Sequence, residues 1–469
     1  MEGNNGKKAV KAGVWYTVAN FVTKGAMFLT TPLFTRMMSK QDIGNYSNIA
    51  SWVTLLTVLL SLDFATSLVV ARFDYKEEFD KYISSTLIYG TIISLFFYLI
   101  SILNMEWVSS FLSMPVYSIH LMFAYICVYP ALLMYQYKCR YEYNYKGVII
   151  SSLGTLAIST LCALVLTFFS DDKLFGRTFG YYGPSIAICV IIYIYLLNKG
   201  RCVTLKYFTY AFKICFPMIW HVLAGHVLSA GDRIVITKYI GPEANAMYSI
   251  AYTCAMALLV LWSSMNTAWA PWATEQMHDG NISLMRKATY PYIGVFVFVS
   301  IYALLLGPEL LLVFGGRGYV EARAVLPPVV VGYIFQMVYS LYVNAEFYLR
   351  KQTQIAIGTI IAAFLNIILN IIFVPKYGYV AAAYTTLFGY ICLAMFHFLT
   401  VKKMEKASWF DNKFQWGIAL GSLLLIPICL ILYEYTIIRW ILIGIFTIGF
   451  IAAMVKYRKK VLRLLKMLK

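Results

Sequence analysis

The chain carries the segment TRMMSKQDIGNYS at residues 35–47 and a related segment, TKYIGPEANAMYS, at residues 237–249. Four pairs match without a gap at an offset of 202 residues: Thr35 with Thr237, Arg36 with Lys238, Tyr46 with Tyr248, and Ser47 with Ser249. Apolar runs flank both segments, and the same offset carries later apolar runs onto one another. The pattern predicts that the chain is an internal duplication.

The composition places this duplication in a membrane. Of the 469 residues, 61% are apolar and 13% are charged, and a soluble protein of this length cannot bury so much apolar surface. The net charge of +18 is typical of cytoplasmic loops that face an anionic leaflet, so we expect membrane lipids and not nucleic acid as partners. The nine cysteines form no C-x-x-C pair, which argues against a zinc site or a disulfide framework.

Fourteen apolar runs are long enough to cross the hydrocarbon layer, which takes about 20 helical residues. They lie at 12–38, 45–70, 82–104, 118–137, 148–170, 178–198, 212–240, 244–268, 288–306, 325–349, 352–374, 378–400, 414–433 and 436–455. With the N-terminus inside, the cytoplasmic segments carry 28 Lys and Arg residues and the outer segments carry 9. This excess predicts that both termini face the cytoplasm. The two remaining cations, Lys24 and Arg233, lie within spans.

Six spans per copy make the two copies enter the membrane from the same side. We therefore expect an all-α integral membrane protein of about 14 transmembrane helices, with two parallel six-helix lobes around a central cavity and two C-terminal helices. The expected units are lobes at 1–205 and 206–405, two additional spans at 406–455, and a basic amphipathic tail on the inner leaflet at 456–469. Facing lobes suit alternating access, whereas a duplication kept only for packing is the alternative.

Ionisable groups at membrane depth are costly and usually face a cavity or one another. Lys24 lies near the midplane, and the offset places His226 at the same depth across the cavity; a snorkelling lysine and a hydrogen-bonded buried histidine are the structural alternatives. Asp63, late in the second span, is a candidate proton or cation site, or else pairs with a neighbouring helix. Asp232 and Arg233 are candidates for substrate contact or for a charge pair between the lobes.

Polar and aromatic patterns add two expectations. Asn366 and Asn370 are four residues apart on one helical face, so we expect them to hydrogen-bond across helices. At the cytoplasmic end of the fourth span, tyrosines alternate with cations, Arg140 and Tyr141 among them, and Arg72 lies in the preceding cytoplasmic segment. Aromatic faces beside cations suit a sugar attached to pyrophosphate, whereas an interfacial aromatic belt explains the same tyrosines without a ligand.

Sequence motifs of common enzymes are missing. The sequence contains no P-loop, H-E-x-x-H, G-x-S-x-G or G-x-G-x-x-G motif, and its outer loops hold no D-x-D pair. We therefore expect no enzyme activity, no catalytic residue, no metal and no cofactor. Transport driven by ATP hydrolysis on this chain is excluded by the same absence.

Three groups of residues resemble the signatures of bacterial polysaccharide repeat-unit flippases of the O-antigen and capsule (Wzx-like) type. They are Lys24-Gly25 through Phe28-Leu29-x-x-Pro32-Leu33-x-Thr35-Arg36 with Asp42-x-Gly44-x-Tyr46, Asp232-Arg233 before Tyr248, and Pro375-x-x-Gly378 before Ala381-Ala382-Ala383. Ala381 takes the place of a glycine that is usual in the last group. The resemblance covers essentially the whole chain and indicates the polysaccharide transporter branch of the superfamily that also holds multidrug exporters and lipid II flippases.

The resemblance implies export of oligosaccharide repeat units, linked to undecaprenyl pyrophosphate, from the inner to the outer leaflet of the bacterial cytoplasmic membrane. It assigns the headgroup to Lys24, His226, Arg233 and Arg36, the cytoplasmic entrance to Arg72, Arg140 and Tyr141, and ion coupling or charge pairing to Asp63 and Asp232. The expected drive is antiport of H⁺ or Na⁺, and the membrane potential adds about 2.3 kcal/mol per charge per 100 mV. Polysaccharide assembly enzymes are further expected partners.

Three other functions remain open on the sequence alone. A multidrug or lipid II exporter would share the fold. A membrane glycosyltransferase or polysaccharide polymerase would need a large outer loop with clustered acids or arginines, which this sequence lacks. A non-transporting scaffold for sugar assembly would tolerate charge changes in the cavity.

Overall fold

A computed structural model of the chain describes residues 22–23, 25–449 and 451, and all regular structure in these residues is helical. Twelve of the described helical segments are long and apolar enough to cross a membrane. The N-terminal half contains a helix at 25–37, then α2 (Lys40–Leu60), η1 (Phe64–Ser67), α3 (Leu68–Asp74), η2 (Lys76–Glu78), α4 (Phe79–Leu103), α5 (Met105–Leu112), α6 (Val116–Tyr141), α7 (Tyr145–Phe169) and α8 (Lys173–Gly200).

The C-terminal half follows the same pattern of long helices joined by short connections. It contains α9 (Leu205–Tyr239), α10 (Pro242–His278), α11 (Ile282–Leu305), α12 (Gly307–Phe314), η3 (Arg317–Val325), α13 (Leu326–Tyr348), α14 (Gln352–Tyr377), α15 (Val380–Lys403), η4 (Ala407–Trp409), α16 (Asn412–Ser422), α17 (Leu425–Leu432) and a last apolar helix, Thr436–Gly449. The fold class expected from hydropathy is confirmed, because period and length are local properties that the sequence carries directly.

Local sequence explains where several helices begin and end. Ser39, Asn144 and Asp172 precede α2, α7 and α8, and each side chain accepts a hydrogen bond from a backbone amide of the first turn. Gly378 ends α14 with φ +77°, and Gly241 precedes α10 with φ +123°. Glycine adopts these angles without the steric penalty that a Cβ would bring.

The second expected span differs from the structure. The apolar run predicts one helix through 45–70, but α2 ends at Leu60, and Leu62 and Asp63 take positive φ angles of 53° and 44°. The chain then continues as η1 and α3. The expected run 414–433 is also divided, into α16 and α17. Of the expected first span, 12–38, and last span, 436–455, the described residues include only parts, and the tail 456–469 lies outside them.

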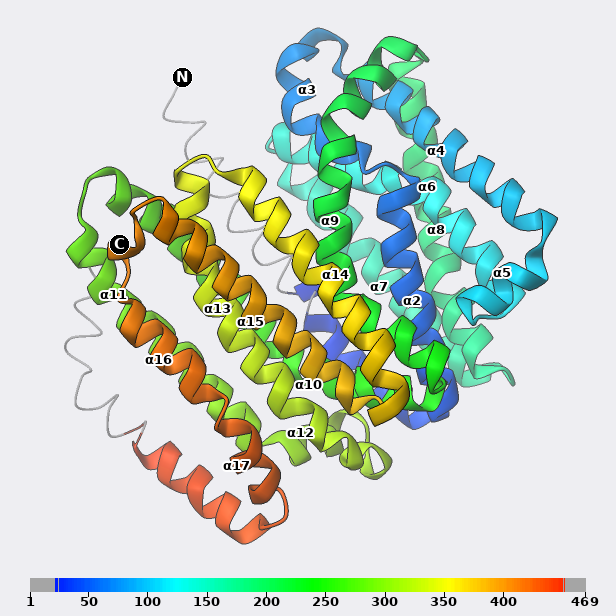
Figure 1. Cartoon of the computed structure of the whole chain (residues 1–469). Helices are drawn as coiled ribbons and strands as arrows, with labels where there is room; N and C mark the ends of the chain where they lie inside the picture. Colours follow the sequence, from blue (N-terminus) through cyan, green and yellow to red (C-terminus); the bar gives the residue numbers. More distant parts are fainter. Residues whose placement is uncertain (1–21, 24, 450, 452–469) are drawn as a thin grey trace.

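The two halves lie side by side and share α9. Figure 1 shows α4, α6 and α8 on one side and α11, α13 and α16 on the other, with α9 and α14 between them. The expected boundary at 205/206 falls at the start of α9. The first turns of α9 pack on the N-terminal half, where Tyr207 donates to Glu78 over 2.7 Å. Its last turns pack on the C-terminal half, so α9 crosses from one bundle to the other.

The halves touch at one end, which we call the closed end and define by Thr35, Ser47, Ser249 and Phe314. The Oγ atoms of Ser47 and Ser249 are 2.6 Å apart, and Thr35 donates to the carbonyl of Phe314 over 2.6 Å. Because Ser47 and Ser249 differ by the repeat offset, their contact is what a two-fold axis between α2 and α10 would produce. We therefore propose that the two halves are parallel lobes related by such an axis, and the contact of Ser47 with Ser249 supports this proposal.

Glycine permits this close approach. A Cβ built on Gly44 in α2 would lie 1.7 Å from the carbonyl oxygen of Pro242 at the start of α10. Backbone cannot yield cheaply at that distance, so only glycine lets α2 and α10 meet here. The Gly44 carbonyl also accepts a hydrogen bond from Asn245 over 2.9 Å. Figure 1 shows the ribbons of the two halves approaching at this end and diverging toward the other.

Candidate functional site

A buried polar cluster surrounds Asp232, and we call it the Asp232 cluster: Asp232, Tyr248, Asn366, Asn370, Thr385 and Thr386. The Asp232 carboxylate, 1% exposed, accepts from Asn370 over 2.7 Å, from Thr386 over 2.6 Å and from the Tyr248 hydroxyl. Asn366 also donates to Thr386 over 3.1 Å, which confirms the expected hydrogen bonding of the two asparagines across helices. Four helices, α9, α10, α14 and α15, therefore converge on one carboxylate.

The charge of the Asp232 cluster is not balanced by an ion pair with any residue that the structure describes. Among the described residues, no Lys, Arg or His nitrogen lies within 4.0 Å of the Asp232 carboxylate. The neighbouring Arg233 turns away, donating to the carbonyl of Ser229 over 2.8 Å and lying 4.7 Å from the centre of the Tyr252 ring. Carboxylate, amide and hydroxyl oxygens are ligands for hard cations, and a proton would neutralise the same carboxylate.

Asp63 lies in the break between α2 and η1. Its Oδ2 accepts from Thr66 over 2.6 Å, and its backbone carbonyl accepts from the thiol of Cys215 in α9 over 3.4 Å. The expectation that Asp63 sits within a continuous helix is wrong, because the positive φ angles at Leu62 and Asp63 interrupt it. Within the described part of the chain, no cationic side chain lies within 4.0 Å of this partly exposed carboxylate.

The residues expected at the headgroup are dispersed. Lys24 lies outside the described residues. His226 is half-buried on α9, and no hydrogen bond of its ring is found among the described residues. Arg36 is exposed at the closed end, where it donates to the carbonyls of Pro32 over 2.6 Å and Val313 over 3.3 Å. Arg36 therefore links the two halves in this conformation.

The residues expected at the cytoplasmic entrance divide between two hollows on either side of α6. Arg72 lies between the rings of Phe73 and Tyr141, 4.3 Å from the centre of each. Both Arg72 and Tyr141 line a polar hollow of about 780 Å³. Arg140 instead lines a pocket of about 200 Å³ within the N-terminal half.

This second hollow, which we call the aromatic pocket, is defined by Tyr125, Tyr129, Gln136, Arg140, Ser152 and Tyr181. The rings of Tyr125 and Tyr129 stack with centroids 4.7 Å apart. Stacked rings, an amide and a guanidinium are groups that bind sugars and phosphates. The sequence places Arg140 near the cytoplasmic end of its span, in what is the last turn of α6, but it does not show which neighbouring helices enclose the side chain.

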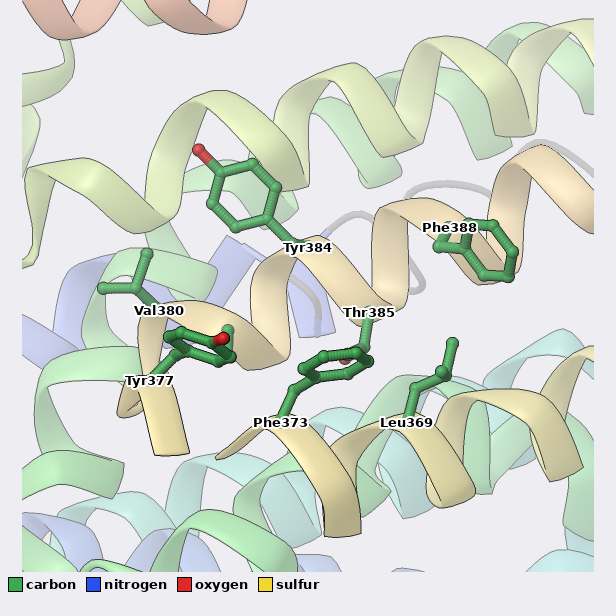
Figure 2. A pocket seen from close by; sticks show the side chains of 8 residues that line it. Leu369, Phe373, Tyr377, Val380, Tyr384, Thr385 and Phe388 are labelled. Carbon is green, nitrogen blue, oxygen red and sulfur yellow. The ribbon is translucent and has the colours of Figure 1, made fainter. Parts of the chain in front are cut away.

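An apolar groove lies behind the Asp232 cluster, between α14 and α15. Leu369 and Phe373 of α14 line this groove together with Tyr384 and Phe388 of α15, and Figure 2 shows Thr385 of α15 pointing toward α14. The groove has a volume of about 470 Å³. Thr385 also donates to Asn370 over 2.5 Å, so one side chain belongs to both the groove and the cluster.

Comparisons with known proteins give one family and one fold. A family model described as polysaccharide biosynthesis protein matches residues 9–277. An uncharacterised membrane protein of Methanocaldococcus jannaschii is 20% identical over 498 residues, covering 94% of each chain. The lipid II flippase MurJ, in an inward closed conformation, superposes with a TM-score of 0.69 at 19% identity over 96% of this chain and 100% of its own. An inward-facing transporter of the multidrug resistance MATE family gives 0.60 at 12% identity over 85% and 98%.

Proposed function

Because the chain belongs to the polysaccharide biosynthesis protein family and has the fold of MurJ and MATE transporters, we propose that it flips lipid-linked oligosaccharides across the membrane. The substrate is an oligosaccharide repeat unit on undecaprenyl pyrophosphate, moved from the inner to the outer leaflet of the bacterial cytoplasmic membrane. Both termini face the cytoplasm in this proposal, as the distribution of Lys and Arg favours. The family and its fold neighbours are flippases and transporters, which agrees with the expectation of no enzyme activity.

One observation carries the proposal. Apart from the first turns of α9, the hydrogen bonds found between the two halves lie at the closed end, as those of Thr35, Ser47 and Asn245 do. Among the described residues, only α9 links the halves by hydrogen bonds away from the closed end, so the halves can part there by a movement of this one helix. Alternating access then exchanges the joined and free ends around a central site.

The headgroup is the part of the substrate that needs a polar path. In our proposal the sugar lies against the aromatic pocket, where Arg140 and Gln136 offer hydrogen bonds and Tyr129 offers a ring face. The two phosphates are bound by cations, Arg72 at the entrance and Lys24, His226 and Arg233 further along. The isoprenoid tail stays in the bilayer, because no polar group has to cross with it.

The Asp232 cluster is the proposed site of ion coupling. A single buried carboxylate surrounded by amide and hydroxyl groups exchanges a proton or Na⁺ at a lower cost than one already fixed in an ion pair. The cluster joins α9 to α14 and α15, so its occupancy bears on the packing of the helix that crosses between the halves. Asp63 is the second candidate for the same role.

The test uses purified protein in liposomes that contain fluorescent lipid-linked oligosaccharide, scored by exposure of the sugar on the far leaflet. Exchange of Arg140 for Gln should reduce exposure at least tenfold, whereas exchange of Lys402 for Gln, an exposed cation in the last turn of α15 away from both hollows, should change it little. Lys24→Ala is expected to abolish exposure. Wild-type protein that exposes no lipid-linked sugar, although correctly inserted, would exclude the proposed function.

The likeness to MurJ favours one alternative, a lipid II type of headgroup on the same lipid carrier. The two substrates differ in the sugar and the attached peptide and share the pyrophosphate. Parallel liposomes with lipid II distinguish them, because the proposal expects faster exposure of the oligosaccharide carrier. Faster exposure of lipid II would reassign the substrate and keep the flippase.

A further inference from the structure

Arg177 is a cation held between aromatic rings in the N-terminal half. It belongs to the second turn of α8, and its guanidinium carbon lies 3.7 Å from the centre of the Tyr46 ring and 4.1 Å from that of Phe34. Its Nη1 approaches the sulfur of Met38 at 3.7 Å. The expected spans 148–170 and 178–198 leave Arg177 between them, as an outer-loop charge, whereas α8 turns it inward.

The charge of Arg177 has no counter-ion within the part of the chain that the structure describes. Among the described residues, no carboxylate lies within 4.0 Å of its guanidinium, and its Nε is buried without a hydrogen-bond partner. Arg439 provides the contrast, because it is equally close to the end of a helix but binds Glu309 through both terminal nitrogens. Cation–π contacts offset only part of the cost of keeping an arginine out of water, so Arg177 retains unused donors.

A second unused donor comes from the other half. Among the described residues, the buried hydroxyl of Tyr319 in η3 has no hydrogen-bond partner, and the centre of its ring lies 5.6 Å from the Lys40 ammonium. These groups surround the closed end, beside the contact of Ser47 with Ser249. Donors from both halves are therefore gathered where the halves must separate if this end opens.

We propose that Arg177 and Tyr319 form an anion site that takes the pyrophosphate group of the substrate at the closed end when that end opens. The inference rests on the proposed function and adds an exit-side position to it. A guanidinium presents a planar fork that matches two phosphate oxygens, and a phenol adds a third donor. The site is incomplete in the closed conformation, because the two halves exclude the ligand that would satisfy it.

The test needs protein whose closed end is open. Gly44→Ala provides it, because the added Cβ meets the Pro242 carbonyl oxygen. Binding of farnesyl pyrophosphate to the full-length G44A chain in detergent is measured by calorimetry, with S47C/S249C cross-linked protein as the closed reference. We expect binding at least tenfold tighter to G44A. Adding Arg177→Gln should remove that gain, Arg177→Lys should restore part of it, and Tyr319→Phe should weaken binding a few fold.

Controls separate phosphate recognition from other effects. Lys376→Gln removes an exposed charge in the last turn of α14 and should leave binding unchanged. Farnesyl monophosphate should bind more weakly than the pyrophosphate, and inorganic pyrophosphate should bind weakly but with the same dependence on Arg177. If farnesol competed as strongly as farnesyl pyrophosphate, the site would recognise the isoprenoid chain of the ligand and not its phosphates, and the proposal would be overturned. Equal binding by G44A and G44A/R177Q would also overturn it.

The flippase assay distinguishes failure of the anion site from failure of the proposed function. If wild-type protein exposes no lipid-linked sugar while G44A binds farnesyl pyrophosphate through Arg177, the proposed function fails and the anion site stands. If R177Q flips pyrophosphate-linked and monophosphate-linked carriers in the wild-type ratio, the anion site fails and the flippase stands. This second comparison does not depend on G44A and serves if that variant does not fold.

Discussion

A disulfide between positions 47 and 249 tests whether the closed end must open during transport. The Oγ atoms of Ser47 and Ser249 are 2.6 Å apart. A disulfide requires sulfur atoms about 2.05 Å apart, so the double cysteine variant needs a shift of only about half an ångström at the γ atoms. We expect S47C/S249C to cross-link under mild oxidation with α2 and α10 in their present positions.

The size of the effect follows from the fraction of molecules that can open. If about 90% of the protein is cross-linked, about a tenth of the flipping rate should remain. Removal of both hydroxyl groups should have the opposite effect, because it weakens the closed end and increases the fraction of molecules in which that end is open. A hydrogen bond contributes about 0.5–1.5 kcal/mol, so S47A with S249A should raise the open population by up to about tenfold. The lock and the deletion therefore make predictions of opposite sign from one contact.

The assay follows lipid-linked oligosaccharide in liposomes before oxidation, after oxidation and after addition of a reductant. Cross-linking is quantified by non-reducing electrophoresis after cleavage between the two positions. Each single cysteine variant controls for oxidation of the nine native cysteines, which are free. Wild-type flipping by fully cross-linked protein would refute the reasoning, because transport would then proceed with the closed end shut.

Three further outcomes are expected. Gly44→Ala should hold α2 away from Pro242, and a membrane-impermeant thiol reagent added outside should then label a cysteine at the closed end several times faster than in the parent; unchanged labelling would contradict the close approach. Asp232→Asn keeps the shape of its cluster but removes the charge, so flipping should no longer respond to an imposed H⁺ or Na⁺ gradient, and a retained response would exclude this site. Glu346→Ala leaves His397 without its buried partner, and thermal unfolding should show a loss of about 3 kcal/mol with unchanged flipping per folded molecule.

Hydropathy predicted most of the fold because the length of a membrane helix is a local property. It failed at Asp63, where the break in α2 depends on positive φ angles at two residues that are neither glycine nor proline. Neighbouring segments stabilise that turn, since Cys215 of α9 donates to the Asp63 carbonyl. No single-sequence signal marks such a turn, because its stability comes from helices far along the chain.

The candidate site was predictable to the extent that polar residues are rare at membrane depth. Asp232 and the two asparagines of α14 stood out for that reason, and the structure brings them together. Thr385 and Thr386 were not distinguishable from threonines that bond to their own helix. Arg177 was missed because it lies just before the expected span 178–198 and was therefore assigned to the outer loop, and only the packing of α8 against α2 turns it inward.

The break at Asp63 has a mechanical consequence. At the repeat offset its counterpart is Met265, which lies inside α10, a helix that runs uninterrupted for 37 residues. One copy of the duplicated sequence is thus broken at this position, whereas the other copy is a continuous helix. If the halves move about the contact of Ser47 with Ser249, we expect the N-terminal copy to bend at residues 62–63, where the helical hydrogen bonding is already broken, whereas α10 offers no such break.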